Sequence, residues 1–167
     1  MSLTVFLSGV DVTSKVRINT LNIRKNINTK NTLNVTFEQT NVQAGQEIEV
    51  KEGNTILFGG LIQNISRKFL SPSETEVSVY ATGYEQVCSR RTFGGVFNNK
   101  YAGEIIRTLL NAWLSTSSPF SEGFTEGVIE NGLYIPSYTI RAKNFMDVLD
   151  DLSEASGFKW WVDSNKK

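Results

Sequence analysis

Three carboxylates near the end of the sequence have the spacing of a possible metal site. Asp147, Asp150 and Asp151 lie at i, i+3 and i+4 of an amphipathic stretch, so they share one face of a predicted helix. Carboxylates grouped in this way could hold a hard cation such as calcium. The same spacing is typical of a solvated polar face that lies opposite the apolar stripe and is favoured by the helix dipole. We expect the solvated face, with no metal and no cofactor.

A second pair of carboxylates, Glu122 and Glu126, could in principle supply the acid and base that glycosidases use. Both lie in a segment rich in Ser, Gly and Pro that runs from residue 115 to residue 127. Such a segment does not hold two carboxyl groups at a fixed separation, and it does not raise the pKa of one by burial. Hydrolysis of peptidoglycan is therefore the least favoured function.

The one cysteine, Cys88, has two arginines nearby, Arg90 and Arg91, which could lower the pKa of its thiol. The sequence contains no histidine, so the Ser-His and Cys-His pairs of many nucleophilic enzymes are excluded. A small buried apolar residue is the simpler interpretation of Cys88. We therefore expect no catalytic residue, and a protein that is not an enzyme.

Trp160 and Trp161 are candidates for contact with a partner. They lie in residues 158–162, which we predict to be a strand, and adjacent side chains of a strand point to opposite faces. Only one of the two can pack on the helix predicted over residues 144–156. The other is partly exposed, or it meets a second layer, a further part of the chain or a partner. The predicted interface residues are Trp160, Trp161, Arg90 and Arg91.

The composition favours a β-rich protein that binds neither nucleic acid nor membrane. Of the 167 residues 40% are hydrophobic, which suits a packed core, and aromatic residues are common while prolines number only three. The 17 basic residues balance 17 acidic ones, so the positive surface of a nucleic-acid-binding protein is missing. No apolar run approaches the roughly 20 residues that span a bilayer. A single cysteine fits folding in a reducing cytoplasm.

Alternation of apolar and polar residues predicts about six strands in the first part of the chain. They cover residues 3–7, 21–27, 32–38, 46–51, 55–65 and 74–82. Leu33, Val35 and Phe37 would face the core of this unit. Two consecutive glycines, Gly59 and Gly60, interrupt the long apolar strand and indicate a bulge, a sharp bend or a close approach of another backbone.

Helical periodicity begins at Tyr84 with a short turn and continues in two amphipathic helices, over residues 101–114 and 144–156. Asn144 and Asp147 have the spacing of a capping box, and Gly157 ends the second helix. Extended pieces over residues 132–135 and 138–140 are divided by Pro136, which suits an edge strand. The predicted fold is mainly β, with a β-barrel unit over residues 1–98 and a small α+β unit, helix-strand-helix-strand, over residues 99–167.

Several motifs occur in an order that resembles the N-terminal part of bacteriophage tail baseplate hub proteins. They are GVDVT (9–13), FGGLI (58–62), Tyr84 before Arg90 and Arg91, YAGEII (101–106) and LDDLSEASGFKWWVD (149–163). The resemblance covers nearly the whole chain and extends to the spike proteins of type VI secretion. It implies a β-barrel of the tail-tube type, two such barrels in each full-length chain, and a ring of three chains with pseudo-sixfold symmetry.

The family resemblance also implies a function and its partners. Hub proteins are structural proteins of the virion that form a homotrimeric ring in the tail of a phage or prophage. They are made in the cytoplasm of the bacterial host. The ring adapts a hexameric tail tube, or a distal tail protein, to a trimeric spike or a cell-wall-degrading tip. The sequence stops just after Val162 and Asp163, where hub proteins continue into a second barrel, so we expect a truncated chain that associates weakly.

Two other functions remain open at this stage. One is a carbohydrate-binding or adhesin module of a tail receptor-binding protein, which would hold sugars on exposed aromatic side chains. The other is a peptidoglycan hydrolase, which the missing histidine and the poor setting of Glu122 and Glu126 make the weaker alternative.

Overall fold

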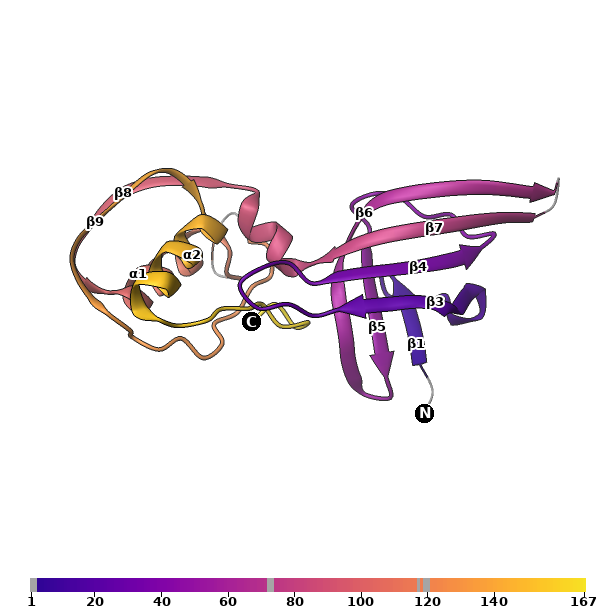
Figure 1. The fold of residues 1–167 in the computed structure, drawn as a ribbon, viewed down its shortest axis with the longest axis horizontal. Coiled ribbons are helices and arrows are strands. Elements are labelled where there is room, and N and C mark those ends of the chain that lie inside the picture. Colours follow the sequence, from indigo (N-terminus) through magenta and orange to yellow (C-terminus); the bar gives the residue numbers. More distant parts are fainter. Residues whose placement is uncertain (1–2, 72–73, 117, 119–120) are drawn as a thin grey trace. The chain divides into compact units, whose positions relative to one another are not determined.

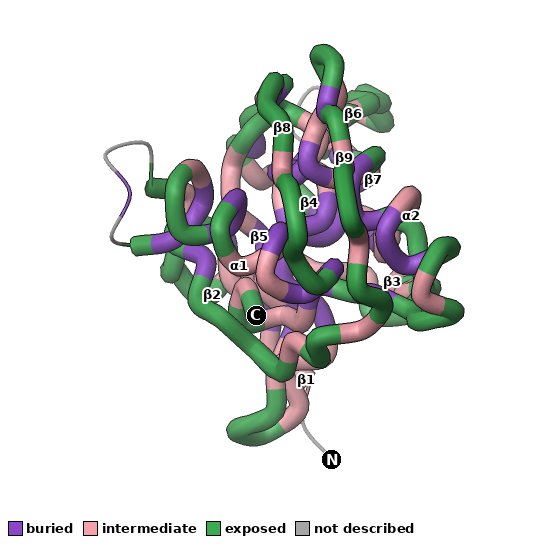
Figure 2. The backbone as a smooth tube through the Cα atoms, turned by 90° about the vertical axis from the view of Figure 1, so that its left-hand side faces the viewer, coloured by how far each residue is buried: buried purple, intermediate pink, exposed green. Residues whose placement is uncertain are grey.

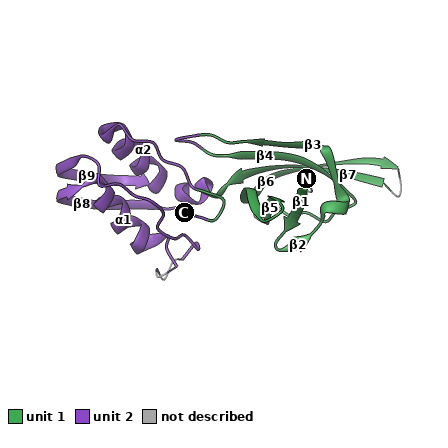
Figure 3. Cartoon of the chain, turned by 90° about the horizontal axis from the view of Figure 1, so that it is seen from below, with its two compact units in different colours: residues 1–26, 30–84, 163–165 green, residues 27–29, 85–162, 166–167 purple. Residues whose placement is uncertain are grey.

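The alternating apolar segments form one antiparallel sheet, and the helical segments form a second unit. The computed structural model describes residues 3–71, 74–116, 118 and 121–167. Unit 1 holds residues 1–26, 30–84 and 163–165, and unit 2 holds residues 27–29, 85–162 and 166–167 (Figure 3).

Unit 1 is a curled sheet of seven strands in the order β2-β1-β5-β6-β7-β4-β3, and every neighbouring pair is antiparallel (Figure 1). The strands are β1 (Leu3–Leu7), β2 (Val10–Asp11), β3 (Val16–Arg24), β4 (Thr32–Glu38), β5 (Glu47–Glu52), β6 (Thr55–Ser71) and β7 (Glu74–Gly83). The prediction of a mainly β fold is confirmed. In the described residues no ladder joins β2 to β3, so the sheet curls like a barrel but has two end strands.

The predicted core of unit 1 is confirmed. Leu33, Val35 and Phe37 of β4 are buried, and they belong to one cluster with apolar residues from the other strands. Full burial of such a side chain stabilises the fold by about 1.5–3 kcal/mol relative to exposure. The predicted strand over residues 21–27 is shifted, because β3 ends at Arg24 and Ile27 is exposed in the connection to β4.

The long strand β6 turns a corner at the two glycines, as predicted. It pairs with β5 as far as Leu61 and with β7 from Gly60 onward, and Figure 1 shows it changing direction between these partners. The bulges lie on either side of the glycines, because Leu57 and Gln63 have no opposite residue. A Cβ atom on Gly60 would lie 2.2 Å from the carbonyl oxygen of Thr82, so glycine is required by close backbone approach.

Unit 2 wraps a two-stranded ribbon around two helices. The ribbon consists of β8 (Thr92–Tyr101) and β9 (Tyr134–Asn144), and the helices are α1 (Ala102–Trp113) and α2 (Phe145–Ser156). The helices pack on each other, α1 on β8 and α2 on β9 (Figure 1). A short 3-10 helix (Tyr84–Ser89) takes the place of the predicted turn.

Both predicted helices are confirmed. Ile105, Leu109 and Leu110 of α1 are buried, and Ile106 is partly buried. In α2 the side chain of Asn144 accepts a hydrogen bond from the backbone N–H of Asp147 at 3.0 Å, and Gly157 ends the helix with a φ of 68°.

Strand β8 was not predicted. Its sequence contains Gly94-Gly95 and Asn98-Asn99, pairs that are typical of loops, and sequence alone places the unit boundary there. Because β8 pairs with β9 along its length, residues 85–98 belong to unit 2, which differs from the expected division at residue 98. β9 runs without a break through Pro136, which a ribbon of two strands tolerates because each strand has an unpaired side.

The predicted strand over residues 158–162 is wrong. This segment is extended, but it joins no sheet: the Phe158 N–H donates to the Ser153 carbonyl oxygen of α2, and Trp160 exchanges two hydrogen bonds with Asn28. The Trp160 N–H donates to Asn28 Oδ1 at 2.8 Å and the Asn28 N–H donates to the Trp160 carbonyl oxygen at 3.0 Å. Two bonds to a single residue do not make a ladder.

We expect Gly60→Ala to lower the free energy of unfolding by about 3 kcal/mol, since the new methyl group meets backbone atoms that cannot move aside. Urea denaturation followed by circular dichroism measures this. Gly94→Ala is the matched control, because its Cβ would have no neighbour nearer than 3.9 Å. Equal stability of Gly60→Ala and the parent chain would contradict the corner described for β6.

We expect Leu109→Asp to abolish cooperative folding of unit 2, because it places an unpaired charge among the buried residues of α1. Limited proteolysis should then cut within residues 85–162. Asn111→Asp, an exposed position of the same helix, serves as the control. An unchanged melting temperature of Leu109→Asp would show that the buried face of α1 is assigned incorrectly.

Candidate functional site

The three carboxylates of α2 each serve the structure of unit 2. Asp147 takes part in the helix cap, and Asp150 accepts a hydrogen bond from the indole N–H of Trp160 at 2.7 Å. Asp151 accepts from the hydroxyl of Tyr138 at 2.7 Å and also binds the ammonium of Lys143. Among the residues that the structure describes, no group of three or more His, Cys, Asp or Glu side chains could hold a metal ion.

The electrostatics around Asp151 have opposing causes. Partial burial acts to raise the pKa of Asp151, but the hydrogen bonds from Lys143 and Tyr138 outweigh it, so the pKa lies below its usual range. Burial and the bond to Asp151 raise the pKa of the Tyr138 hydroxyl. The carboxylate is therefore a charged anchor between α2 and β9, rather than a group that exchanges protons near neutral pH.

Glu122 and Glu126 form ion pairs with different arginines. Glu122 lies 3.6 Å from Arg90 Nη1 and 3.3 Å from Arg91 Nη2, and Glu126 Oε1 accepts from Arg107 Nε at 2.8 Å. The two carboxylates therefore bind different arginines, and their ion pairs join separate parts of unit 2.

Cys88 is buried and unreactive. Burial first, and the nearby carboxylate of Glu85 second, raise the pKa of its thiol to about 12. Arg90 and Arg91, which sequence reasoning considered as activators of the thiol, pair with Glu122. The thiol is therefore protonated at neutral pH, and it packs as an apolar side chain.

The two tryptophans have different environments. Trp160 is buried and its indole N–H donates to Asp150, so it holds the segment after α2 in place. Trp161 is 60% exposed. Trp161, Arg90 and Arg91 therefore stay candidates for an interface, and the side chain of Trp160 is the one least available to a partner.

The unpaired edge of β6 is a larger feature that sequence reasoning did not locate. β5 accompanies β6 only as far as Leu61, and the loop before β5 adds two backbone bonds, both to Ile62. Beyond this point, residues 63–71 pair with β7 on one side, and no described strand lies on the other. β3 forms the opposite end of the same four strands and also has one partner, β4. An unpaired row of backbone N–H and C=O groups is a template for a further strand.

Other surfaces of unit 2 are less regular. Figure 2 shows that most of β8 and β9 is exposed. Arg107 binds Glu126, Asn131 and the Ile129 carbonyl oxygen, so it fixes the segment between α1 and β9. No sequence signal identifies Arg107, because its partners are distant in the chain.

Within the described residues no helix has the length and apolar character to cross a bilayer.

Sequence comparison identifies no relative of this chain. No family model matches it, and none of the curated proteins matches it either.

Comparison of structures does find similar proteins. A 43 kDa tail protein of prophage MuSo2 from Shewanella oneidensis has a TM-score of 0.77 and 13% identity over 99% of this chain. A tail protein from Neisseria meningitidis has a TM-score of 0.68 and 10% identity, also over 99%. An Escherichia coli component of the type VI secretion system, described as structurally similar to the T4 bacteriophage tail proteins gp27 and gp5, has a TM-score of 0.55 and 10% identity over 83%.

The chain spans about half the length of the first two of these proteins, 52% and 48%. Both of its units take part in the likeness, because the matches extend over nearly all of its residues. The chain therefore has, over almost its whole length, the fold of about half of each of these two tail proteins.

Proposed function

We propose that this chain is a structural part of a phage or prophage tail, at the baseplate hub, and that it has no catalytic activity. The observation that supports this most strongly is the likeness to the Shewanella tail protein over 99% of the chain, through both units. The resemblance of the sequence motifs to hub proteins points to the same place in the tail.

In this proposal the two units are separate domains with different tasks. Unit 1 is the tail-tube-like domain, whose curled sheet contributes a segment of a ring. Unit 2 is the small α+β domain that follows it. The ring joins a hexameric tube, or a distal tail protein, on one side to a trimeric spike or a lysin tip on the other. The full-length protein forms this ring as a homotrimer with two tube-like domains in each chain.

A ring could form by pairing of strand edges between copies, because β6 is longer than its neighbour β5 and its distal half has no described strand on that side. The distal half of β6, residues 63–70, and the end strand β3 have no described strand at opposite sides of the same four strands. Pairing of β6 from one copy with β3 from the next would extend the sheet from subunit to subunit. Each edge then satisfies backbone donors and acceptors that water otherwise solvates.

The environments of the three residues considered as catalytic candidates, Glu122, Glu126 and Cys88, support the proposal that the chain has no catalytic role. Glu122 and Glu126 are bound to arginines, and Cys88 has a pKa of about 12 because it is buried. A protein with this arrangement contributes surfaces to an assembly and leaves hydrolysis of the cell wall to another component.

An adhesin is the second candidate function, and one observation favours it. Tyr101 and Tyr134 are partly exposed and their rings lie 5.5 Å apart at one end of the ribbon. A sugar would stack on an open ring face, but the two rings are edge to face at 72°, so each blocks part of the other. Binding to a glycan array that is lost in Tyr134→Ala would favour this function over the hub.

The hub proposal predicts where the protein lies in the virion. A peptide tag fused to the chain and decorated with an antibody fragment should appear at the distal end of the tail tube in cryo-EM averages. Untagged particles are the control. Density along the whole tube, density on the fibres alone, or tagged protein missing from purified particles would each contradict the proposal.

The edge contact predicts the effect of proline in β6. Backbone donors of successive residues point to opposite sides of a strand, so Ser66→Pro and Arg67→Pro remove donors from different sides. The variant that loses a bond to β7 should melt at a lower temperature. The other keeps its bonds to β7, so it should melt at the higher temperature of the two, yet associate more weakly than the parent in sedimentation velocity at high concentration. Normal association of both variants would exclude β6 as the contact edge.

A further inference from the structure

The segment between α1 and β9 holds the one asparagine of the chain that glycine follows, Asn131. Most of the other asparagines precede Thr, Ile or Val. Asparagine is thermolabile because the backbone nitrogen of the next residue can attack its side-chain amide. A β-branched side chain crowds that nitrogen, whereas glycine leaves it open. Asn131-Gly132 is therefore the pair in this sequence that is most prone to the reaction.

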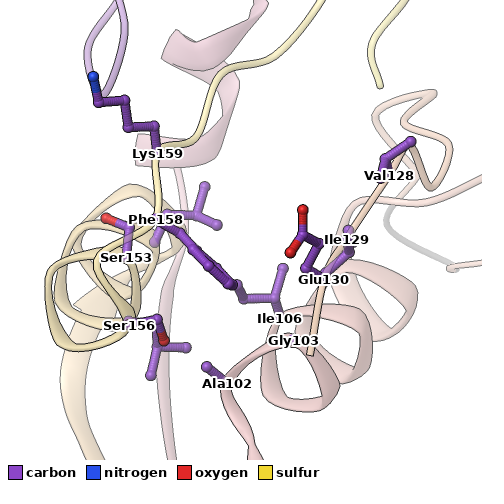
Figure 4. Close-up of a pocket in the computed structure, with 12 residues that line it drawn as sticks. Ala102, Gly103, Ile106, Val128, Ile129, Glu130, Ser153, Ser156, Phe158 and Lys159 are labelled. Atoms are coloured by element: carbon purple, nitrogen blue, oxygen red, sulfur yellow. The ribbon is translucent and has the colours of Figure 1, made fainter. Parts of the chain in front are cut away.

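The backbone of Asn131 is held against α1. Figure 4 shows Ile129 and Glu130, the two residues before it, beside Gly103 in the first turn of the helix. A Cβ atom on Gly103 would collide with the Glu130 carbonyl oxygen, so the segment and the helix are in close contact. The Gly103 N–H also donates to the Asn131 carbonyl oxygen at 2.9 Å. Asn131 is nevertheless exposed, so water reaches its side chain.

Glycine is required after Asn131 by the conformation of the chain. The φ of Gly132 is 65°, and a Cβ atom there would lie 2.9 Å from Ser156 Oγ. The next residue is fixed too, because the Leu133 N–H donates to Ser156 Oγ at 3.2 Å. In the part of the chain that the structure describes, the Gly132 N–H donates no hydrogen bond. The nitrogen that would attack therefore lies between two bonded residues and has no competing bond to this part of the chain.

Arg107 of α1 acts on the amide that would be attacked. Its Nη1 donates to Asn131 Oδ1 at 3.0 Å. When a nucleophile attacks Asn131 Cγ, negative charge develops on this oxygen, and a cationic donor already in place stabilises that charge. Arg107 is itself held by Glu126 and by the Ile129 carbonyl oxygen, so it needs no rearrangement during the reaction. The structure therefore joins a free backbone nitrogen to a polarised side-chain amide.

We propose that Asn131 is a site of spontaneous deamidation that Arg107 promotes. Hydroxide removes the proton of the Gly132 N–H, and the nitrogen then attacks Asn131 Cγ. The new N–Cγ bond closes a succinimide ring, the Cγ–Nδ2 bond breaks, and Nδ2 leaves as ammonia with a proton from water. No oxidant or reductant takes part. This modification site is independent of the role in a phage tail proposed above.

Water then opens the ring at either of its two carbonyl carbons. Addition at Cγ gives an aspartate, whose side-chain carboxylate replaces the amide that Arg107 binds. Addition at the main-chain carbon gives an isoaspartate, in which the former Asn131 carbonyl oxygen belongs to a free carboxylate. The Gly103 N–H binds that oxygen in the first turn of α1, where the helix dipole favours negative charge. Each product therefore places its new charge beside a donor that the structure already supplies.

The reaction rates of the folded and the unfolded chain test the proposal. The parent chain is incubated in mildly alkaline buffer, with and without urea, and the peptide that holds Asn131 is followed by mass spectrometry. Replacement of the amide by a carboxylic acid adds about 1 Da. We expect the folded chain to react about fivefold faster than the chain in urea, because only the fold brings Arg107 to Oδ1. Asn54 and Asn165, exposed residues followed by Thr and Lys, should keep their amides.

Two variants separate the effect of the guanidinium from that of a fixed segment. Arg107→Gln removes the donor to Oδ1, so it should lower the rate in the folded chain to about that in urea and leave the rate in urea unchanged. Glu126→Gln is the matched control, because it removes another partner of Arg107 and leaves the bond to Asn131. This control should react as fast as the parent. Asn131→Gln should give no product in the same peptide, since its longer side chain requires a larger ring.

Several results would overturn the proposal. A folded parent chain that reacts no faster than the chain in urea would show that the fold does not promote the reaction. A folded Arg107→Gln that reacts as fast as the parent would remove Arg107 from it. Equal slowing in Arg107→Gln and Glu126→Gln would mean that Arg107 acts only by fixing the segment. If thermal melting shows that Arg107→Gln does not fold, Arg107→Lys takes its place, and it should react more slowly than the parent because lysine lacks the forked donors.

Discussion

The structure of unit 1 depends on one close approach, between Gly60 of β6 and the backbone of Thr82 in β7. Because no Cβ separates these strands, β6 can leave β5 and follow β7 without losing its ladder. Bulges at Leu57 and Gln63 take up the change of direction on either side. The curl of the sheet and the change of partner strand along β6 both follow from this corner.

The unpaired edge is a consequence of strand lengths. β5 covers residues 47–52 while β6 covers residues 55–71, so β5 is too short to accompany β6 beyond the corner. Natural proteins usually protect such an edge with bulges, charges or a covering loop. Here the loop before β5 reaches only Ile62 by backbone bonds, and Arg67 reaches Val42 by its side chain. An edge that stays open is a position where a further strand can extend the sheet.

The sequence was sufficient for elements whose periodicity is strong and local. The alternation in β4 and the capping box of α2 each specify a fold element within a few residues. It was insufficient for β8, since Gly94-Gly95 and Asn98-Asn99 have low strand propensity and the strand forms only because β9 pairs with it from a distant part of the chain. The prediction of a strand around Trp160 was wrong for the opposite reason. Its pattern is suitable, but no neighbouring strand is available to it.

The candidate site residues also depend on partners that are distant in the sequence. Sequence spacing placed the three aspartates on one face of a helix but did not identify the partners of the candidate carboxylates, because Glu122, Asp150 and Asp151 are bound by residues from other elements. Their chemistry is used to join helices, ribbon and loop within unit 2. The open edge of β6 is built differently, from backbone groups, and it carries no sequence motif. Contacts made by backbone geometry tolerate many different sequences.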